Sequence, residues 1–453
     1  MMGKRVEVVY MRKRFPKTIT LILAAVLSVA CLAGCGKKTD DFVTLTMWHV
    51  YGEQASSPMD VLVEEFNSTV GQENGIIINV TANSNATAIG QALLDAQAGK
   101  PGSKEMPDLF FCHPDNAVAL GVENLVDWND CFTEEELSAY NPDFIAEGMI
   151  DDHLAVFPVS KSTHMLFING SMFARFSADT GVTLDDLATW DGFFAAAEKF
   201  YAWSGGKLFC AMDYILRAVE LSALSKHPDA DFYTEDGWYD FGNAVWKNEW
   251  DRFTDALVKG YITVSDLFSN TQVMTGEALC GLGSSAAILY YNDTVTYPDN
   301  SSEPMNLIVL PIPTNKGKTA LDTQAGVGLC AYKTTDEKAE VTAVFAKWLT
   351  ESDRNLDFVT AAGYMPVTED AFAKLPSYYF GQDSYRSLYA ALDTAYENYT
   401  FLQEPNFKNY YTKVNAFYDI IRARQSEWAA RFSGGESTES LKEECWNDFR
   451  RIE

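Results

Sequence analysis

The chain has 453 residues, of which 47% are apolar, and its 63 acidic against 35 basic residues give a net charge of −28. A balance this acidic argues against nucleic acid as a partner, because phosphates attract a basic protein face. It also disfavours tight contact with an anionic membrane surface. The length allows two or three domains of roughly 150 residues each.

The N-terminal segment has the order of an export signal. Basic residues precede an apolar run from Ile19 to Ala30, which is too short to cross a ~30 Å hydrocarbon core comfortably. The run closes with Leu-Ala-Gly-Cys at 32–35, which resembles the lipobox of bacterial lipoproteins. We therefore expect a signal peptide at 1–34, a lipidated Cys35 with a linker at 35–41, and a lipid anchor at the extracellular face of the cell membrane. An ordinary signal peptide is the alternative, and Met11 is a second possible start.

Strands and helices alternate in the next segment. Thr44–Tyr51, Ile76–Val80 and Asp108–Cys112 are rich in branched and aromatic residues and predict strands. A helix is predicted from Ser57 and Pro58, a capping residue followed by a proline, with a stripe of apolar residues behind them. The stripe of this helix consists of Met59, Leu62, Val63 and Phe66. A second helix is predicted over Ile89–Ala98.

Strand, helix and strand in this order predict a largely parallel sheet with right-handed crossovers. Ligands of such sheets gather at the carboxyl ends of the strands. These ends fall at Trp48–Glu53, Thr81–Thr87 and His113–Asn116.

Later elements continue the pattern and then become helical. Asn306–Pro313 and Gly326–Tyr332 predict buried strands. A capping box of Thr334 and Glu337 predicts the start of a helix. Its apolar stripe is Val341, Val344, Phe345 and Trp348; a longer helix carries Tyr410, Val414, Phe417 and Ile421, and a final helix begins at Ser437 after Gly434-Gly435.

Neither a cofactor nor a metal is indicated. The five histidines have no ligand spacing, and the six cysteines after Cys35 are scattered, which favours buried single thiols. No G-x-S-x-G, H-E-x-x-H, Walker loop or G-x-G-x-x-G motif occurs. We therefore expect a protein that is not an enzyme, with a secreted glycoside-acting enzyme as the rival class, since acidic residues are abundant.

The order of several short motifs carries a resemblance to a known family. TLTMWHVYGE, MPDLFF, FPVSKSTHMLFIN, GEALCGLGSSAAI, VLPIP and AAGYMPV follow one another along the chain. Together they resemble the family 1 extracellular solute-binding proteins of ABC importers, and most nearly the sn-glycerol-3-phosphate-binding type.

The resemblance implies an α/β fold of the two-lobed periplasmic-binding-protein-like class (type II). Each lobe would be a mainly parallel sheet flanked by helices, with the ligand cleft between the lobes. Lobe one would comprise 42–158 plus 306–350, and lobe two 159–305 plus 351–453. Pro158, Pro311 and Pro313 would lie where hinge strands cross.

The resemblance also implies a set of ligand-binding residues. Short polar side chains would bind hydroxyls, and aromatic rings would pack on the C–H faces of a sugar or polyol. For Trp48 a core position is the alternative, and for Tyr364 it is packing of a turn aromatic on the adjacent helix. The set is Trp48, His49, Glu53, Asn85, His113, Asp115, Ser162, Tyr214, Ser284, Ser285, Gly326 and Tyr364.

One departure from the family pattern bears on the ligand. A glycerol-3-phosphate site would hold its phosphate partly with an arginine, but LQEPNFKNYYTKVN offers only Lys408 and Lys413 before Arg422. Arg217 could compensate, although a charged helix face is the commoner explanation. We therefore expect a carbohydrate or polyol as ligand, with glycerol-3-phosphate or a glycerophosphodiester as the alternative. ABC permease subunits are the implied partners, a sensor role stays open, and a monomer is the family default.

Overall fold

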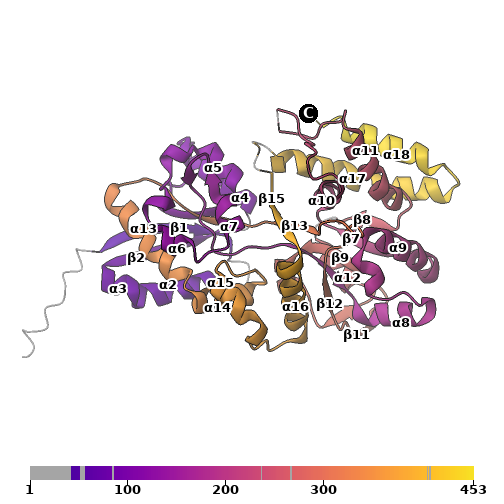
Figure 1. Cartoon of the computed structure of the whole chain (residues 1–453), viewed down its shortest axis with the longest axis horizontal. Helices are drawn as coiled ribbons and strands as arrows, with labels where there is room; N and C mark the ends of the chain where they lie inside the picture. Colours follow the sequence, from indigo (N-terminus) through magenta and orange to yellow (C-terminus); the bar gives the residue numbers. More distant parts are fainter. Residues whose placement is uncertain are drawn as a thin grey trace, which may run out of the picture. The chain divides into compact units, whose positions relative to one another are not determined.

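The computed structural model describes residues 42–51, 57–83, 86–235, 237–265, 268–405, 407 and 410–452. From Thr44 onward the chain forms one compact unit. Its two main sheets each have their own helices (Figure 1). Within these described ranges, no helix is long and apolar enough to cross a membrane.

The first sheet has the strand order β14-β3-β1-β2. Its strands are β1 (Val43–His49), β2 (Ile76–Ala82), β3 (Leu109–Cys112) and β14 (Gly328–Ala331). Strand β1 is parallel to β3, with Met47 opposite Leu109, whereas β14 is antiparallel to β3. Helices contact this sheet or its neighbours: α2 (Pro58–Ser68), α3 (Val70–Asn74), α4 (Ala86–Gln97), α5 (Pro114–Leu120) and α13 (Asp336–Leu349).

Local sequence explains how α2 forms and what it covers. The Ser57 hydroxyl accepts a hydrogen bond from the Asp60 amide (3.2 Å), and Pro58 occupies the first helical turn. The predicted stripe is buried at Met59, Val63 and Phe66. The Phe66 ring packs edge-on against two rings of α13, which belong to the predicted stripe of that helix, Phe345 and Trp348.

The predicted start of α13 is wrong by one residue. Thr335 caps the helix, because its side chain accepts a hydrogen bond from the Lys338 amide. The Thr334 hydroxyl instead donates to the carboxylate of Asp108 (2.6 Å). A buried carboxylate therefore engages the hydroxyl that the sequence pattern assigned to the cap.

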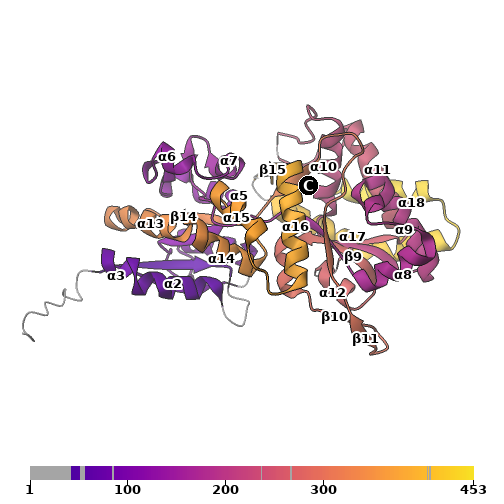
Figure 2. The same ribbon diagram turned by 60° about the horizontal axis from the view of Figure 1, so that its bottom comes forward.

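The second sheet has the order β12-β6-β9-β7-β8. Its strands are β6 (His164–Ile168), β7 (Leu208–Met212), β8 (Ile262–Val264), β9 (Ala278–Ser284) and β12 (Ile308–Pro311). Figures 1 and 2 show its helices, which are α8 (Gly170–Thr180), α9 (Trp190–Ser204), α10 (Ile215–Lys226), α11 (Ala244–Val258), α12 (Ser269–Met274), α16 (Asp383–Asn398), α17 (Tyr410–Ser433) and α18 (Thr438–Phe449).

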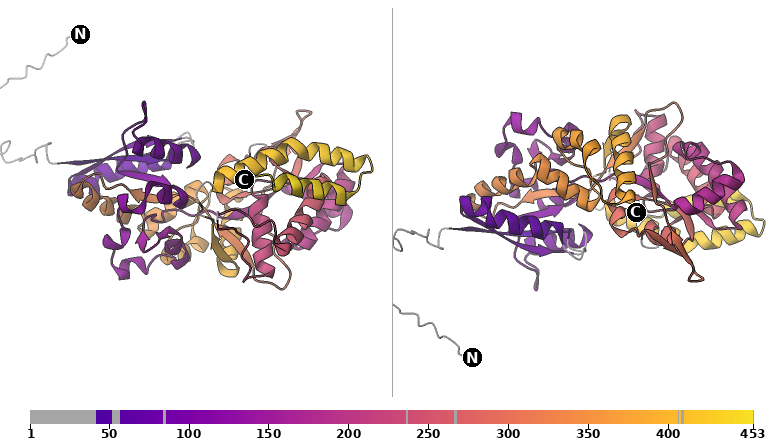
Figure 3. Two further views of the ribbon diagram at one scale, coloured as in Figure 1. Left: turned by 90° about the horizontal axis from the view of Figure 1, so that it is seen from above. Right: turned by 90° about the horizontal axis from the view of Figure 1, so that it is seen from below.

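The C-terminal helices agree with the sequence prediction. Tyr410, Val414, Phe417 and Ile421 are all buried on α17, and Ser437 caps α18. In Figure 3 these two helices, in yellow, lie along the second-sheet part of the chain, and both contact α11. Aromatic residues from all three helices share one core, in which Trp250 stacks on Phe449 with 4.9 Å between ring centroids.

The second sheet is mixed rather than mainly parallel. Strand β6 pairs antiparallel with both β9 and β12, while β7 is parallel to β8 and β9. Both neighbours of β6 are antiparallel to it, and antiparallel pairing requires no crossover helix between strands. The extended segment before β6 can therefore lead straight into the sheet. The pairing also puts 308–311 in the second sheet, whereas the sequence division expected 306–350 in lobe one.

Helix α14 (Ser352–Ala362) and helix α15 (Glu369–Lys374) also differ from the expected division, which assigned 351–453 to lobe two. Helix α14 contacts α2, and Thr368 forms a bridge with Tyr140. Both therefore pack with first-sheet elements. Smaller elements are α6 (Glu134–Leu137), α7 (Pro142–Gly148), β4 (Met149–Ile150), β5 (His153–Leu154), β10 (Thr294–Thr296), β11 (Ser302–Pro304) and the 3₁₀ turns η1 (Val122–Asn124), η2 (Trp128–Asp130), η3 (Asp185–Ala188), η4 (Ser285–Tyr290) and η5 (Leu375–Ser377).

Several extended segments run between the two sheets and pair with one another. Phe157 bridges Leu329, Ser162 bridges Ala325, and Lys161 bridges Met365. A further pair, β13 (Leu321–Gln324) and β15 (Thr400–Gln403), is parallel. These paired segments connect the first-sheet part of the chain to the second, and we call them the crossing segments.

The six cysteines of the described residues are all free, and only Cys131 among them is partly exposed. The Sγ atoms of Cys112 and Cys330 lie 3.6 Å apart in the first sheet. Cys210 and Cys280 stand opposite one another in the second sheet.

Candidate ligand-binding site

Several of the sequence-predicted residues meet where a crossing segment passes the end of β3. The Ser162 amide donates to the Ala325 carbonyl (2.8 Å), and its hydroxyl points to the same oxygen (3.3 Å). The imidazole of His113 donates to the carbonyl of Gly326. Gly326 has a φ of +121°, a backbone conformation that side-chain-bearing residues rarely adopt. Ser162, Gly326 and His113, all named in the sequence analysis, are therefore neighbours.

Asp115 lies beside them in the first turn of α5. An acid suits this position, because the N-terminus of a helix carries a partial positive charge. Its Oδ1 is shielded from solvent and has no hydrogen-bond partner among the described residues. Burial raises the pKa of Asp115, and the nearby His113 opposes that shift. This oxygen of the carboxylate is therefore unused.

A cavity of about 210 Å³ opens at Asp115. Its walls come from α4 and α5 on one side and from the start of α17 on the other. The ring of Tyr411 lies 5.1 Å from that of His113, tilted by 34°, and so closes the cavity from the α17 side. The lining residues are Ala86, Gly90, Gln91, Leu94, His113, Asp115, Asn116, Ala119, Tyr411 and Thr412.

A second carboxylate lies behind Tyr411. The Tyr411 hydroxyl donates to Glu404, which follows β15 directly. Burial raises the pKa of Glu404, although Lys161 and Arg217 partly offset this effect. The charge of Glu404 in turn contributes to the raised pKa of Asp115, so the two carboxylates act on one another.

Tyr364 lies in the turn after α14 and is partly exposed. Its ring is 6.0 Å from that of Tyr51, edge to face, and its carbonyl accepts from the Tyr389 hydroxyl (3.0 Å). The Tyr51 hydroxyl is hydrogen-bonded to the Ser160 hydroxyl (3.0 Å) in a crossing segment. Gly363 packs closely on the Ser285 carbonyl, which brings the predicted pair Tyr364 and Ser285 together.

The remaining predicted residues belong to the second sheet. Tyr214 is partly exposed and stacks on His164, with 4.4 Å between the ring centroids and 6° between the planes. Ser284 ends β9, and its hydroxyl accepts from the Ala286 amide (3.3 Å). Ser285 is fully buried, and its hydroxyl has no hydrogen-bond partner among the described residues.

Two predicted residues lie apart from this group. Trp48 is only 5% exposed and packs with Ile89 and Phe110 in the first-sheet core. His49 is fully buried: its Nε2 pairs with Asp60 (2.8 Å), and its Nδ1 accepts from the Tyr51 amide (3.2 Å). The side chains of Trp48 and His49 are therefore both occupied by contacts within the fold.

Three other residues of the sequence analysis, Cys35, Glu53 and Asn85, lie outside the described residues, as does Lys408.

The cations near the site already have partners. Lys161 is 2% exposed and forms an ion pair with Glu147, and burial lowers its pKa to about 7. Arg217 pairs with Glu220 (3.0 Å) and donates to the carbonyls of Leu402 and Gln403. The suggestion that Arg217 compensates for a missing phosphate arginine is therefore not supported, because its guanidinium holds β15 in place.

Arg422 is engaged in a similar way. Its Nε donates to the Ser265 carbonyl (2.7 Å), and its guanidinium pairs with Asp419 (3.1 Å). Lys413 lies over the ring of Trp238 at 5.7 Å.

Sequence reasoning missed four residues of the group: Tyr51, Lys161, Glu404 and Tyr411. Tyr51 and Lys161 stand inside motifs that were used for the resemblance, next to residues that were chosen. Glu404 and Tyr411 belong to the stretch LQEPNFKNYY, in which only a basic residue was sought. The acid and the tyrosine in that stretch were the available signal.

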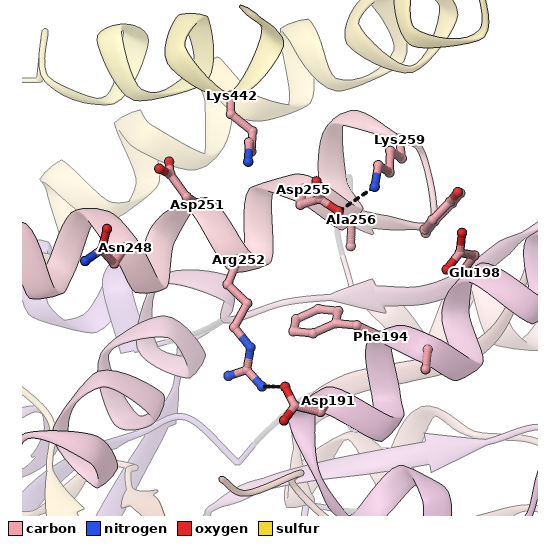
Figure 4. A pocket seen from close by; sticks show the side chains of 12 residues that line it. Asp191, Phe194, Glu198, Asn248, Asp251, Arg252, Asp255, Ala256, Lys259 and Lys442 are labelled. Carbon is pink, nitrogen blue, oxygen red and sulfur yellow. Dashed lines mark hydrogen bonds and ion pairs between the residues drawn. The ribbon is translucent and has the colours of Figure 1, made fainter. Parts of the chain in front are cut away.

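A larger cavity of about 520 Å³ lies elsewhere, between α9, α11 and α18 (Figure 4). Four of its charged residues form pairs: Arg252 with Asp191, and Lys259 with Asp255 (2.6 Å). None of the predicted ligand-binding residues lines it. It is therefore not the candidate site.

Comparisons with solved structures show the fold. The binding protein for cyclic alpha-maltosyl-1,6-maltose from Arthrobacter globiformis is 16% identical, with a TM-score of 0.65, and the match covers 91% of this chain and 99% of that one. UgpB from Mycobacterium tuberculosis in complex with glycerophosphocholine is 14% identical, with a TM-score of 0.66 and coverage of 90% and 98%. The sugar-binding protein MalE from Xanthomonas citri is 16% identical, with a TM-score of 0.63 and coverage of 90% and 97%.

A comparison with curated protein sequences gave no match. The family comparison was positive: residues 62–378 match the bacterial extracellular solute-binding proteins, and these residues make up well over half of the chain. The resemblance inferred from the order of motifs and the two-lobed fold expected from it are both confirmed. The chain belongs to the family of bacterial extracellular solute-binding proteins.

Proposed function

We propose that this protein captures a carbohydrate or polyol outside the cell and delivers it to an ABC importer. Family membership supports solute binding, and structural relatives bind maltose-type sugars or glycerophosphocholine. The observation that carries the choice of ligand is the state of the cations. Lys161, Arg217 and Arg422 are each paired with an acid, so none is free to neutralise a phosphate.

Tyrosines and small polar groups fit this ligand class. Tyr364 and Tyr214 are partly exposed rings from different parts of the chain, and a sugar can rest its C–H faces on such rings. Ser162, Ser284, Ser285 and Asp115 supply groups that hydrogen-bond hydroxyls. We propose that these residues bind the ligand together with His113 and Gly326.

Binding acts through the crossing segments in this proposal. The candidate residues come from both the first-sheet and the second-sheet parts of the chain, and the crossing segments connect those parts. A ligand that contacts both parts stabilises the arrangement in which the two come together. The ligand can shift the equilibrium between the separated and the joined arrangement only by the difference between its affinities for the two.

We further propose that residues 1–34 are removed and that lipidation of Cys35 holds the protein at the membrane beside its permease. A tether of this kind raises the local concentration of loaded protein. Replacing Cys35 with Ala should release the protein into the medium. Continued firm attachment of the variant to the membrane would refute the tether.

The ligand class is tested by thermal unfolding of the full-length chain against sugars, polyols and glycerol-3-phosphate. A ligand at 100 times its dissociation constant adds about 2.7 kcal/mol of apparent stability. We expect stabilisation by a neutral or amino-substituted sugar or polyol. Stabilisation by glycerol-3-phosphate alone would favour the alternative ligand, and no stabilisation by any member of the panel would overturn the proposed function.

A further inference from the structure

We infer that the 210 Å³ cavity between α4, α5 and the start of α17 receives a protonated amine of the ligand, so that the substrate class is an amino-substituted sugar or polyol. The inference rests on the proposed function and narrows it. Four features support it: one unused oxygen, a second carboxylate, the pairing of the neighbouring cations Lys161 and Arg217 with other acids, and the rings that line the cavity.

The unused oxygen is Oδ1 of Asp115. It is shielded from solvent without a hydrogen-bond partner among the described residues. A buried carboxylate oxygen without a hydrogen bond raises the free energy of the folded protein, and it does so most when the carboxylate is ionised. A ligand donor that enters the cavity removes this penalty, and a charged N–H donor makes a stronger hydrogen bond to a carboxylate than a neutral hydroxyl does.

Glu404 adds a second negative charge on the far side of Tyr411. Its contact in the described structure is the Tyr411 hydroxyl, a neutral donor. Lys161 and Arg217 lie near enough to influence Glu404, but they are committed to Glu147 and Glu220. Two carboxylates therefore share the region, and both cations that act on Glu404 are committed to other acids.

His113 does not supply the missing positive charge. Burial lowers its pKa, Lys161 acts in the same direction, and Asp115 opposes them. Because one ring nitrogen donates to the Gly326 carbonyl, the neutral ring leaves its other nitrogen as an acceptor. The cavity wall is thus rich in acceptors, which suits a donor-rich cation and repels a phosphate.

The size and the walls of the cavity fit one ring of a ligand. A volume of 210 Å³ corresponds to about seven water molecules at liquid density, which is room for one sugar ring. The rings of His113 and Tyr411 lie 5.1 Å apart along it, and an aromatic face attracts a nearby cation as well as sugar C–H groups. A single amino-substituted ring meets both requirements.

The test compares D-glucosamine, N-acetyl-D-glucosamine and D-glucose as probes, each titrated at neutral pH against the full-length chain by calorimetry. These probes share a ring and differ at one substituent. We expect glucosamine to bind at least about tenfold more tightly than either neutral probe. Asp115→Asn, which keeps the shape of the side chain, should abolish this preference.

Asp213→Asn is the matched control, because both carboxylate oxygens of Asp213 already have donors from its own lobe. This variant should keep the preference for glucosamine. Equal or tighter binding of glucose, or a preference that survives Asp115→Asn, would overturn the inference. Failure of all three probes while an oligosaccharide of the panel binds would also overturn it, and the proposed function would then stand. Failure of every sugar and polyol overturns the proposed function itself.

Discussion

Two aspartates occupy equivalent places in the two halves of the molecule. Asp115 follows β3 of the first sheet, and Asp213 follows β7 of the second, each just beyond the carboxyl end of its strand. Burial raises the pKa of both, that of Asp213 to about 6. By position, burial and pKa shift the two carboxylates look alike.

Their hydrogen bonds differ. The Ser269 amide donates to Oδ1 of Asp213 (2.7 Å), the Ser269 hydroxyl donates to Oδ2 (2.8 Å), and the Ser265 hydroxyl donates to Oδ1. Asp115 keeps one shielded oxygen without a partner among the described residues. A raised pKa therefore does not separate a fully hydrogen-bonded carboxylate from one with an unpartnered oxygen, whereas a count of donors does.

The largest predicted effect is a loss of stability, and it compares the two aspartates directly. Asp213→Ala should lower the free energy of unfolding by about 3 kcal/mol, because the buried amide and hydroxyls of Ser265 and Ser269 lose their acceptor. Asp115→Ala should change it by less than about 1 kcal/mol, since it removes fewer satisfied contacts. Urea denaturation of both variants measures the difference. Equal losses would break the distinction between the two aspartates.

The stacked pair His164 and Tyr214, at the edge of the second sheet, allows a second prediction, which concerns stability against pH. Burial and the nearby Arg217 lower the pKa of His164 from 6.5 to about 3. Between these values the unfolded chain takes up a proton that the folded chain does not, so stability falls as pH falls. The loss from this residue is about 1.5 kcal/mol between pH 6.5 and 5. Denaturation at both pH values should show a smaller loss for His164→Phe than for the wild type; equal losses would contradict the assignment.

A smaller effect is expected at Tyr364, which tests whether the partly exposed rings contact the ligand. Tyr364→Ala should weaken binding of whichever panel sugar stabilises the protein by about tenfold, or about 1.4 kcal/mol. Calorimetry measures the affinity. Tyr379→Ala is the control, because Tyr379 is 85% exposed and lies outside the candidate group. Unchanged affinity in the Tyr364 variant would remove this residue from the proposed site.

Much of the fold could be predicted from local patterns. The strands around Met47, Ile78 and Phe110 and the stripes of α2 and α17 were recognisable, because periodicity and caps are properties of short segments. The sheet that contains β12 was not predictable in this way. A run such as NLIVLPIP indicates burial but carries no information about its strand partner.

The candidate site was predictable only in part. His113, Asp115 and Tyr364 were chosen from motif order, and their role in binding stays a prediction. Trp48 shows why motif position alone is a weak guide: the C-terminal part of β1 is buried, and Trp48 packs there in the first-sheet core. Glu404 lies far along the chain from Asp115, and only the folded structure brings their charges within range of one another.

The pairing of β3 with β14 has a consequence for how the chain reaches its native state. Strand β3 ends at Cys112, and its antiparallel neighbour β14 begins at Gly328. The edge of β3 must therefore remain unpaired during synthesis and export until the whole intervening part has followed. Contacts this distant in sequence form slowly, and an open strand edge invites aggregation. The first sheet therefore cannot be completed until the chain has been synthesised as far as β14.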